Sequence, residues 1–167
     1  MTAAALIRPA VPDDAEAIHA MLLDLARGLG FADKIRSTPD SLRRHGFGPA
    51  PAFHGLVAER DGAPVGACLW FAHFSTFRGE PGLYVQDLYV APSERGTGLG
   101  RRLLAAAAAD GRAQGATHLR LSVESGNDGA QRFYAASGLR WQDTERIFLA
   151  DGRAFDTLAD GIEETDE

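Results

Sequence analysis

Cysteine is almost absent from the 167-residue sequence, since Cys68 is the single one. One thiol excludes an internal disulfide, and its place in the apolar stretch 65–72 predicts a buried structural side chain rather than a nucleophile. Long hydrophobic runs are also missing, and no stretch approaches the roughly 18 apolar residues of a transmembrane helix. The first eight residues have no basic start and a short apolar run, which is not typical of a signal peptide. We therefore expect a cytoplasmic protein that does not bind membranes.

Positive charge is scarce as well. Lys and Arg number 17 against 23 Asp and Glu, which gives a formal net charge of −6, and no basic run occurs. This balance excludes the basic footprint of a nucleic-acid-binding protein. It favours a cationic ligand such as an amine, although solubility alone explains the same balance. The length and the 45% hydrophobic content predict a single domain over residues 1–159 with a sizeable core. An acidic tail is expected at 160–167.

The most informative feature that is present is the glycine-rich stretch at 95–101, Arg-Gly-Thr-Gly-Leu-Gly-Arg. The preceding residues 83–90 are rich in β-branched and aromatic types and predict a strand. The following residues 99–114 predict a helix, because one face at helical spacing is apolar: Leu99, Leu103, Leu104, Ala107 and Ala108.

Such a strand–glycine–helix junction attracts phosphate. Glycines let the backbone come close to a ligand, and the N–H groups and dipole at a helix start favour an anion. Arg95 and Arg101 add positive charge. A diphosphate site is therefore predicted, with an ordinary helix start as the alternative. A P-loop is excluded because no Gly-Lys-Ser/Thr follows. The spacing G-x-G-x-G also departs from the dinucleotide fingerprint.

With its neighbours, this stretch resembles the GNAT family of acetyl-CoA-dependent N-acetyltransferases, whose signature is Arg/Gln-x-x-Gly-x-Gly/Ala after a strand. The resemblance covers nearly the whole chain. It includes a first strand at 7–10, a central hairpin at 57–66 and a closing motif formed by Asn127, Phe133, Tyr134 and Gly138. Within the family, the chain is most similar to the diamine (spermidine/spermine) and thialysine acetyltransferases, on the segments 46–48, 53–59 and 75–77.

The resemblance implies an α/β (α+β) GNAT fold: a mixed, mostly antiparallel sheet with a central splayed pair of parallel strands, and helices on both faces. The predicted element order, β-α-α-β-β-β-α-β-α-β-β, fits this fold. The splayed strands would end near Val90 and Val123, and the pantetheine arm of the cofactor would enter between them. The last two strands are expected at Trp141 and at 146–149.

The same resemblance implies a set of site residues. Acetyl-CoA would be the co-substrate, and a hydrogen bond from Asn127 would hold its pantetheine amide, unless Asn127 simply caps the next helix. Tyr134 matches the tyrosine beside the leaving sulfur and is the expected catalytic residue, with an aromatic core pair as the alternative. The backbone of three strand residues would bind pantetheine and the acetyl carbonyl, and a bulge that leaves one amide unpaired would distinguish this role from ordinary pairing. The expected cofactor-binding residues are Leu88, Tyr89, Val90, Arg95, Gly96, Thr97, Gly98, Leu99, Gly100, Arg101 and Asn127.

The residues that would bind the amine acceptor depart from the family pattern, most clearly at position 86. Gln86 stands where the polyamine-acetylating relatives carry a glutamate. An amide cannot accept the amine proton, although it can bond an amine or a water. Gln86, Asp87 and Glu124 are expected to bind the substrate, and the candidates for the base are Asp87, Glu80, Glu124 and His73.

Acids that grip a polyamine in the relatives are also mostly missing. In the loop after the first helix their positions hold Leu29, Ala32 and Asp33, so two of the three are lost. Spermine and spermidine are therefore weakened as substrates.

We thus expect an N-acetyltransferase that moves an acetyl group from acetyl-CoA to a primary amine of a small diamine-like or amino-acid-like molecule, by direct attack in a ternary complex. The alternatives are a non-catalytic acyl-CoA-binding module and a protein or peptide N-acetyltransferase. No metal is expected at the site. The expected partners are the amine and, as the resemblance implies, a second copy of the chain in a homodimer.

Overall fold

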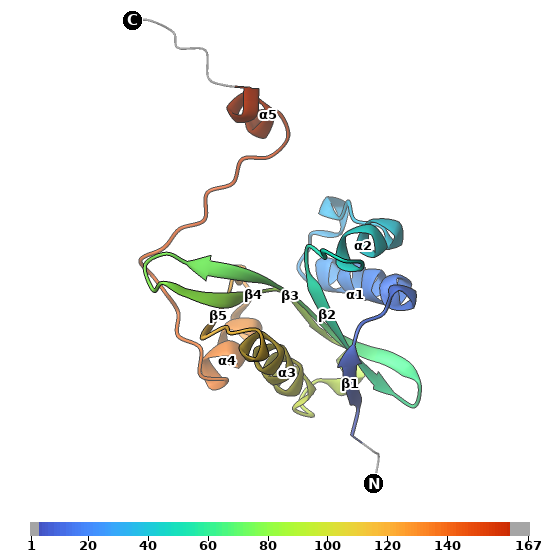
Figure 1. Cartoon of the computed structure of the whole chain (residues 1–167). Helices are drawn as coiled ribbons and strands as arrows, with labels where there is room; N and C mark the ends of the chain where they lie inside the picture. The colour runs from blue at the N-terminus through green and yellow to red at the C-terminus, as the bar shows by residue number, and fades with distance from the viewer. Residues whose placement is uncertain (1–3, 161–167) are drawn as a thin grey trace, which may run out of the picture. The chain divides into compact units, whose positions relative to one another are not determined.

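The structure is a computed structural model in which residues 4–160 are described (Figure 1). The predicted acidic tail therefore lies outside the described residues, apart from Asp160. The chain divides into two compact units, one ending at Gln131 and one beginning at Arg132. The first unit contains the five strands of the described sheet.

Within the described residues, five strands form one mixed sheet in the order β1-β2-β3-β4-β5. Neighbours are antiparallel except the last two, which run parallel. This arrangement confirms the predicted fold class. The strands are β1 (Leu6–Pro9), β2 (His54–Arg60), β3 (Ala63–Ser75), β4 (Glu80–Val90) and β5 (His118–Leu121).

Helices cover both faces of this sheet (Figure 1). On one face α1 and α2 pack against β2 and β3, through a buried cluster of Ala15, Ile18, Leu42, Val57 and Leu69. The helices are α1 (Ala15–Gly28), α2 (Pro39–Gly46), α3 (Leu99–Ala113), α4 (Asp128–Ala136) and α5 (Gly152–Asp160), with short 3-10 turns η1 (Pro12–Asp14), η2 (Ala32–Lys34) and η3 (Pro92–Glu94).

The opposite face carries α3, and a glycine permits the close packing there. A Cβ on Gly66 would lie 3.0 Å from Leu103 Cδ1 and 3.1 Å from the carbonyl oxygen of Tyr89. The predicted apolar face of α3 is buried at Leu99, Leu103, Leu104 and Ala107, and Ala108 is partly buried. Burying these side chains fixes the start of α3 at the end of β4.

Local turns and caps set several element boundaries. Asp61 and Gly62 both have positive φ, 52° and 78°, and form the β2–β3 hairpin turn. Thr38 caps α2 by accepting a hydrogen bond of 3.1 Å from the N–H of Ser41. The start of α1 differs, because Asp14 makes no side-chain cap of that helix. Its carboxylate accepts instead from the N–H of Val11 and from Arg8.

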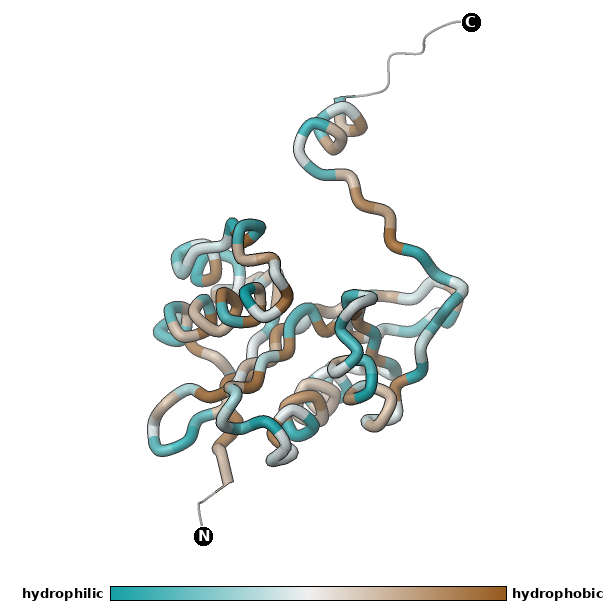
Figure 2. The backbone as a smooth tube through the Cα atoms, turned by 180° about the vertical axis from the view of Figure 1, so that it is seen from behind, coloured by the Kyte–Doolittle hydropathy of each residue, from teal (hydrophilic) through white to brown (hydrophobic). Residues whose placement is uncertain are grey.

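The expectation of two final strands is wrong. Residues 139–150 contain no strand, and α5 follows them. Trp141 and residues 147–149 are almost fully exposed, between 78% and 92%, and Figure 2 shows 147–149 as a hydrophobic stretch of the tube. A short run of β-branched and aromatic residues becomes a strand only beside a partner edge, and none pairs with this segment within residues 4–160.

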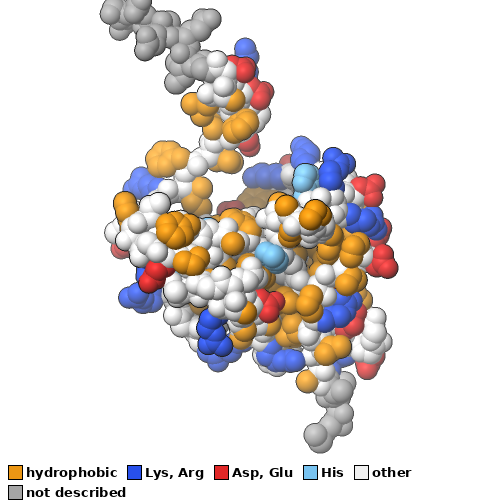
Figure 3. Space-filling model, viewed as in Figure 1, with side chains coloured by type: hydrophobic (Ala, Val, Ile, Leu, Met, Phe, Trp, Pro, Cys, Tyr) orange, Lys and Arg blue, Asp and Glu red, His pale blue; other side chains and the backbone are white. Residues whose placement is uncertain are grey.

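None of the described helices is both long and apolar enough to cross a bilayer. On the face shown in Figure 3, Lys and Arg are interspersed with Asp and Glu.

Candidate active site

The glycine-rich stretch forms the turn that leads into α3. Gly96 and Gly98 have φ values of 77° and 85°, a left-handed backbone that favours glycine. The first intrahelical bond of α3 runs from the N–H of Arg102 to the carbonyl of Gly98, at 3.1 Å. Helix geometry therefore directs the first-turn N–H groups out of the helix end, where they can bind an anion.

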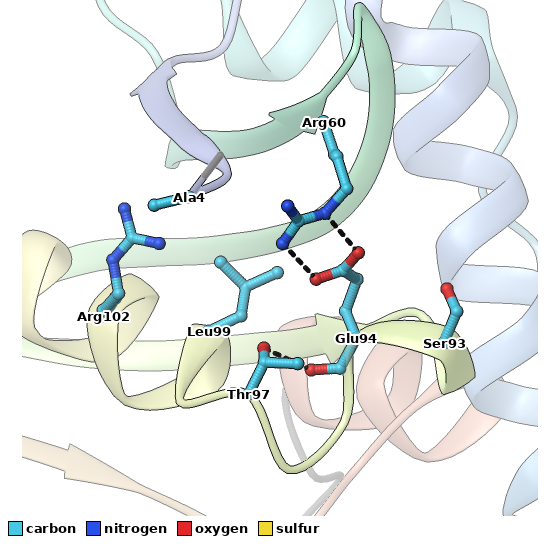
Figure 4. Close-up of a pocket in the computed structure, with 7 residues that line it drawn as sticks. All are labelled: Ala4, Arg60, Ser93, Glu94, Thr97, Leu99 and Arg102. Carbon is cyan, nitrogen blue, oxygen red and sulfur yellow. Dashed lines mark hydrogen bonds and ion pairs between the residues drawn. The ribbon is translucent and has the colours of Figure 1, made fainter. Parts of the chain in front are cut away.

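An ion pair anchors this turn to the sheet. The Arg60 Nε and Nη2 atoms donate to the two carboxylate oxygens of Glu94 at 2.5 and 2.7 Å, and Thr97 Oγ1 donates to the Glu94 carbonyl at 2.7 Å. Figure 4 shows these groups around a cavity of about 460 Å³ that Leu99 and Arg102 also line. The Arg60 guanidinium holds the pKa of Glu94 below its usual range, so the carboxylate beside the turn is ionised and neutralised.

Beyond Val85, the parallel edge of β4 is open. β5 pairs with β4 only from Gly82 to Val85, whereas β4 continues to Val90. The N–H of Ala91 donates to the carbonyl of Val65, which lies on the β3 side. Because N–H directions alternate along a strand, the N–H groups of Leu88 and Val90 point to the opposite, open side.

The Arg95 side chain lies at this open edge. Its Nε donates to the carbonyl of Val90 at 3.2 Å. The predicted parallel pair is thus confirmed, and β4 continues beyond the end of β5 toward the glycine-rich turn.

Strand β4 contains a β-bulge at Gln86. Trp70 pairs with Val85 and Leu69 pairs with Asp87, so Gln86 is an extra residue on β4. Consecutive strand residues normally face opposite sides of a sheet, but a bulge turns two of them to the same side. Gln86 and Asp87 accordingly line one cavity. The bulge lies before Leu88, Tyr89 and Val90, which pair regularly with β3.

That cavity has a volume of about 420 Å³ and a mostly apolar wall. Its polar lining residues are Ser37, Gln86 and Asp87. The apolar ones come from α1, α2, β3 and the loops around α2: Leu22, Ile35, Leu42, Ala52, Phe53, Leu69 and Phe71. These apolar residues cannot be recognised as cavity-lining from the sequence, because they look like ordinary core positions and only the fold brings them together.

Burial raises the pKa of Asp87 to about 6. The carboxylate is therefore mostly ionised at pH 7 and above, with a pKa close to the working pH of a proton acceptor. No other candidate base lines this cavity in the described chain. Burial also raises the pKa of the fully buried Cys68 thiol to about 12, which confirms its structural role.

The other candidate acids and His73 lie elsewhere. Glu80 Oε2 accepts from Thr117 Oγ1 at 2.6 Å at the far end of β4, seven residues and therefore roughly 20 Å from Asp87. Glu124 is exposed beyond the end of β5. His73 makes an edge contact with His118, with ring centroids 4.9 Å apart. Burial, aided by His118 and Arg120, lowers the pKa of His73.

The side chain of Tyr89, one of the expected cofactor-binding residues, points toward α1. Its hydroxyl donates to Asp24 Oδ2 at 2.6 Å. Burial and this bond raise the pKa of Tyr89 to about 12. Its side chain therefore serves packing.

The closing motif lies on and before α4. Asn127 Oδ1 accepts from the N–H of Ala130 at 3.1 Å, so Asn127 caps this helix. Tyr134 belongs to the second unit, and its ring meets that of Phe133 edge-on at 5.1 Å.

The open edge of β4 thus lies between a helix start whose N–H groups suit an anion and a cavity that contains a carboxylate. Residues 18–139 match the Acetyltransferase (GNAT) family. The chain therefore belongs to this family and is an N-acetyltransferase enzyme by class.

The sequence is similar to the thialysine N-epsilon-acetyltransferase of Bos taurus, with 33% identity over 92% of this chain and 96% of the relative. In structure it is similar to an integron cassette protein from the mobile metagenome of V. cholerae, with a TM-score of 0.78 and 20% identity over 95% of this chain and 99% of that one. An aminoglycoside N-acetyltransferase in complex with CoA has a TM-score of 0.64 and 20% identity, over 89% of this chain and 99% of that one.

Proposed function

We propose that the protein transfers the acetyl group of acetyl-CoA to a primary amine of a small molecule, by direct attack in a ternary complex. The observation that carries the proposal is the order of features along β4: the cavity at Gln86 and Asp87, the open edge at Leu88 and Val90, and then the glycine-rich turn. The cattle relative, whose name specifies the ε-nitrogen of thialysine, supports an amine acceptor.

The residues present fit the carrier. The first-turn N–H groups of α3, with Arg95 and Arg101, would hold the diphosphate, and the glycines at 96, 98 and 100 leave room for it. The N–H of Val90 would bond pantetheine, and Asn127 would add a bond to its amide. Bound acetyl-CoA supplies a thioester whose carbonyl carbon bonds to the amine nitrogen while its C–S bond breaks and the thiolate leaves.

The chain's own groups act on the charges that this transfer creates. The N–H of Leu88 would donate to the carbonyl oxygen as negative charge develops there. Tyr134 would donate a hydrogen bond to the departing sulfur. Asp87 would accept the amine proton, because the nitrogen loses its basicity as it bonds to carbon, and Gln86 would orient the amine.

Deprotonation explains why a carboxylate is needed. A primary amine with a pKa of about 10.4 is neutral in only about one molecule in 10³ at pH 7, a cost of roughly 4–5 kcal/mol. The raised pKa of Asp87, about 6, brings it closer to that of the amine than an exposed aspartate would be.

Titration calorimetry with CoA and acetyl-CoA, followed by thiol release over a panel of amines and lysine peptides, tests the proposal. We expect micromolar CoA binding and amine-dependent thiol release, with the acetylated amine identified by mass. Binding without any turnover would indicate an acyl-CoA-binding module instead. A peptide accepted better than every free amine would indicate a protein acetyltransferase.

We also propose that two copies of the chain form a homodimer through the segment 146–149. Ile147, Phe148 and Leu149 are 78%, 92% and 81% exposed in the single chain. A second copy would remove these three consecutive apolar side chains from water.

A further inference from the structure

We infer that the acceptor is an amine with one positive charge and an apolar body, rather than a diamine or an amino acid. The inference rests on the proposed function and deepens it, because it concerns the cavity lined by Gln86 and Asp87. It differs from the substrate in the name of the cattle relative, which carries more than one charged group.

The cavity offers one countercharge. Among its described lining residues Asp87 is the single ionisable side chain, while Gln86 and Ser37 are neutral. One carboxylate balances one ammonium. A second ammonium on the same ligand, or an α-carboxylate, would enter the apolar part of the wall without a partner and would be strongly disfavoured there.

The rest of the wall suits hydrocarbon. Leu69 and Phe71 line it from β3, and Phe53 lines it from the loop after α2. Leu22 and Leu42 line it from α1 and α2. Burying an alkyl or aryl body against these side chains adds binding free energy in proportion to its apolar area. The volume of about 420 Å³ is at the small end for ligand pockets, which suits a compact amine.

The loop after α1 contributes no charge to this wall. It supplies Ile35 and Ser37, although it also contains three ionisable side chains. Asp33 is exposed, the ammonium of Lys34 lies 4.1 Å from the centroid of the Phe31 ring, and Arg36 donates to the carbonyl of Asp33. In the described structure none of the three lines the cavity, so the loop gives a second cationic group no countercharge there.

A matched pair of acceptors tests the inference at pH 8. Hexylamine and 1,5-diaminopentane have the same length, and a methyl group in the first replaces an amino group in the second. We expect kcat/KM, measured by CoA release, to be at least tenfold higher for hexylamine, and thialysine to be used as poorly as the diamine. Equal or better use of either charged acceptor would overturn the inference.

Two variant pairs test whether the missing countercharge is the reason. Ile35→Glu adds a carboxylate to the wall, and Ile35→Gln is its uncharged control of the same size. We expect the hexylamine preference to fall at least tenfold in Ile35→Glu and to persist in Ile35→Gln. Ser37→Asp and Ser37→Asn repeat the comparison at a second position, should the first pair fold poorly. An unchanged preference in both acidic variants would contradict the inference.

A binding measurement separates this inference from the proposed function. If no amine releases thiol, the proposed function fails, and calorimetric titration of the two acceptors into CoA-saturated protein then decides the inference alone. Tighter binding of hexylamine supports a cavity for monoamines. Tighter or equal binding of the diamine, or no binding of either, overturns it.

Discussion

At the residue scale, the ionised carboxylate of Asp87 lowers the stability of the folded state. Burial raises its pKa from 3.8 to about 6, so the folded state binds this proton more tightly than the unfolded chain does. The protonated carboxyl therefore contributes to the free energy of unfolding at low pH, and this contribution is lost as the pH rises from about 4 through 6. Above pH 7 the cost of the ionised group is on the order of 3 kcal/mol.

We predict that Asp87→Asn lowers kcat/KM about 10²-fold at pH 8, as expected when a proton acceptor is removed. The ratio of wild-type to variant kcat/KM for one amine cancels the ionisation of the amine itself. This ratio should rise with pH through about 6, where Asp87 ionises, and level off above 7. A ratio that stays constant from pH 5 to pH 8 would remove Asp87 from the proton transfer.

Urea unfolding of the same variant provides the control. Because the amide that replaces the Asp87 carboxylate would carry no buried charge, the free energy of unfolding should increase by about 1–3 kcal/mol at pH 8 and by less at pH 4.5. A variant that is both less active and more stable cannot owe its lost activity to unfolding. Lower stability at pH 8 would instead assign Asp87 a structural role.

Tyr134 provides the second test at this scale. A hydrogen bond to the leaving sulfur forms only as the thiolate develops, so we predict that Tyr134→Phe lowers kcat about 10²-fold and changes the Kd for CoA by less than about threefold. Steady-state kinetics and calorimetry measure the two quantities. An unchanged kcat would show that the ring serves packing against Phe133 alone.

At the scale of elements, the Arg60–Glu94 ion pair links the glycine-rich turn to β2. Glu94 is buried beside the turn that would bind a diphosphate, and Arg60 at the end of β2 neutralises it. An unneutralised carboxylate there would repel the anion. In the proposed function, the Arg60–Glu94 pair would favour cofactor binding through the charge that it cancels as well as through the position that it fixes.

We predict that Arg60→Met weakens CoA binding about tenfold at pH 8 and less at pH 5.5, because the Glu94 carboxyl would lose the guanidinium that lowers its pKa and would be protonated more readily. The double variant Arg60→Met/Glu94→Gln should regain most of the affinity. Calorimetry at the two pH values measures both effects. Equal weakening in the single and double variants, independent of pH, would mean that the pair acts only as a tether.

Turns and caps that depend on a few neighbouring residues were predictable from the sequence. Features that depend on how distant strands and helices pair were not. Asp61-Gly62 and Thr38-Pro39 set their turn and cap within a few positions. The bulge at Gln86 depends on the register between β3 and β4, which no local pattern reports. The cavity combines residues from Leu22 to Asp87, 65 positions apart. The segment 146–149 has the pattern of a strand, but within the described chain it has no edge to pair with.

At the scale of the whole molecule, the exposed segment 146–149 is the feature that favours a second copy. We predict that wild-type protein is a dimer in solution and that the double substitution Ile147→Ser/Phe148→Ser converts it to a monomer, because the buried apolar area is lost. Light scattering coupled to size exclusion measures the mass. Phe77→Ser, at another fully exposed aromatic, is the matched control and should remain a dimer. A wild-type monomer would contradict the prediction.

The extra residue on β4 also separates two tasks that share one strand. In the proposed function, the strand would present side chains to the acceptor up to Asp87 and main-chain groups to the carrier from Leu88 onward. Main-chain groups do not change when side chains are exchanged. Substitutions at Gln86, Ile35 or Ser37 can therefore redirect the choice of amine while the acyl donor stays the same, which gives one scaffold a short mutational route between different substrates.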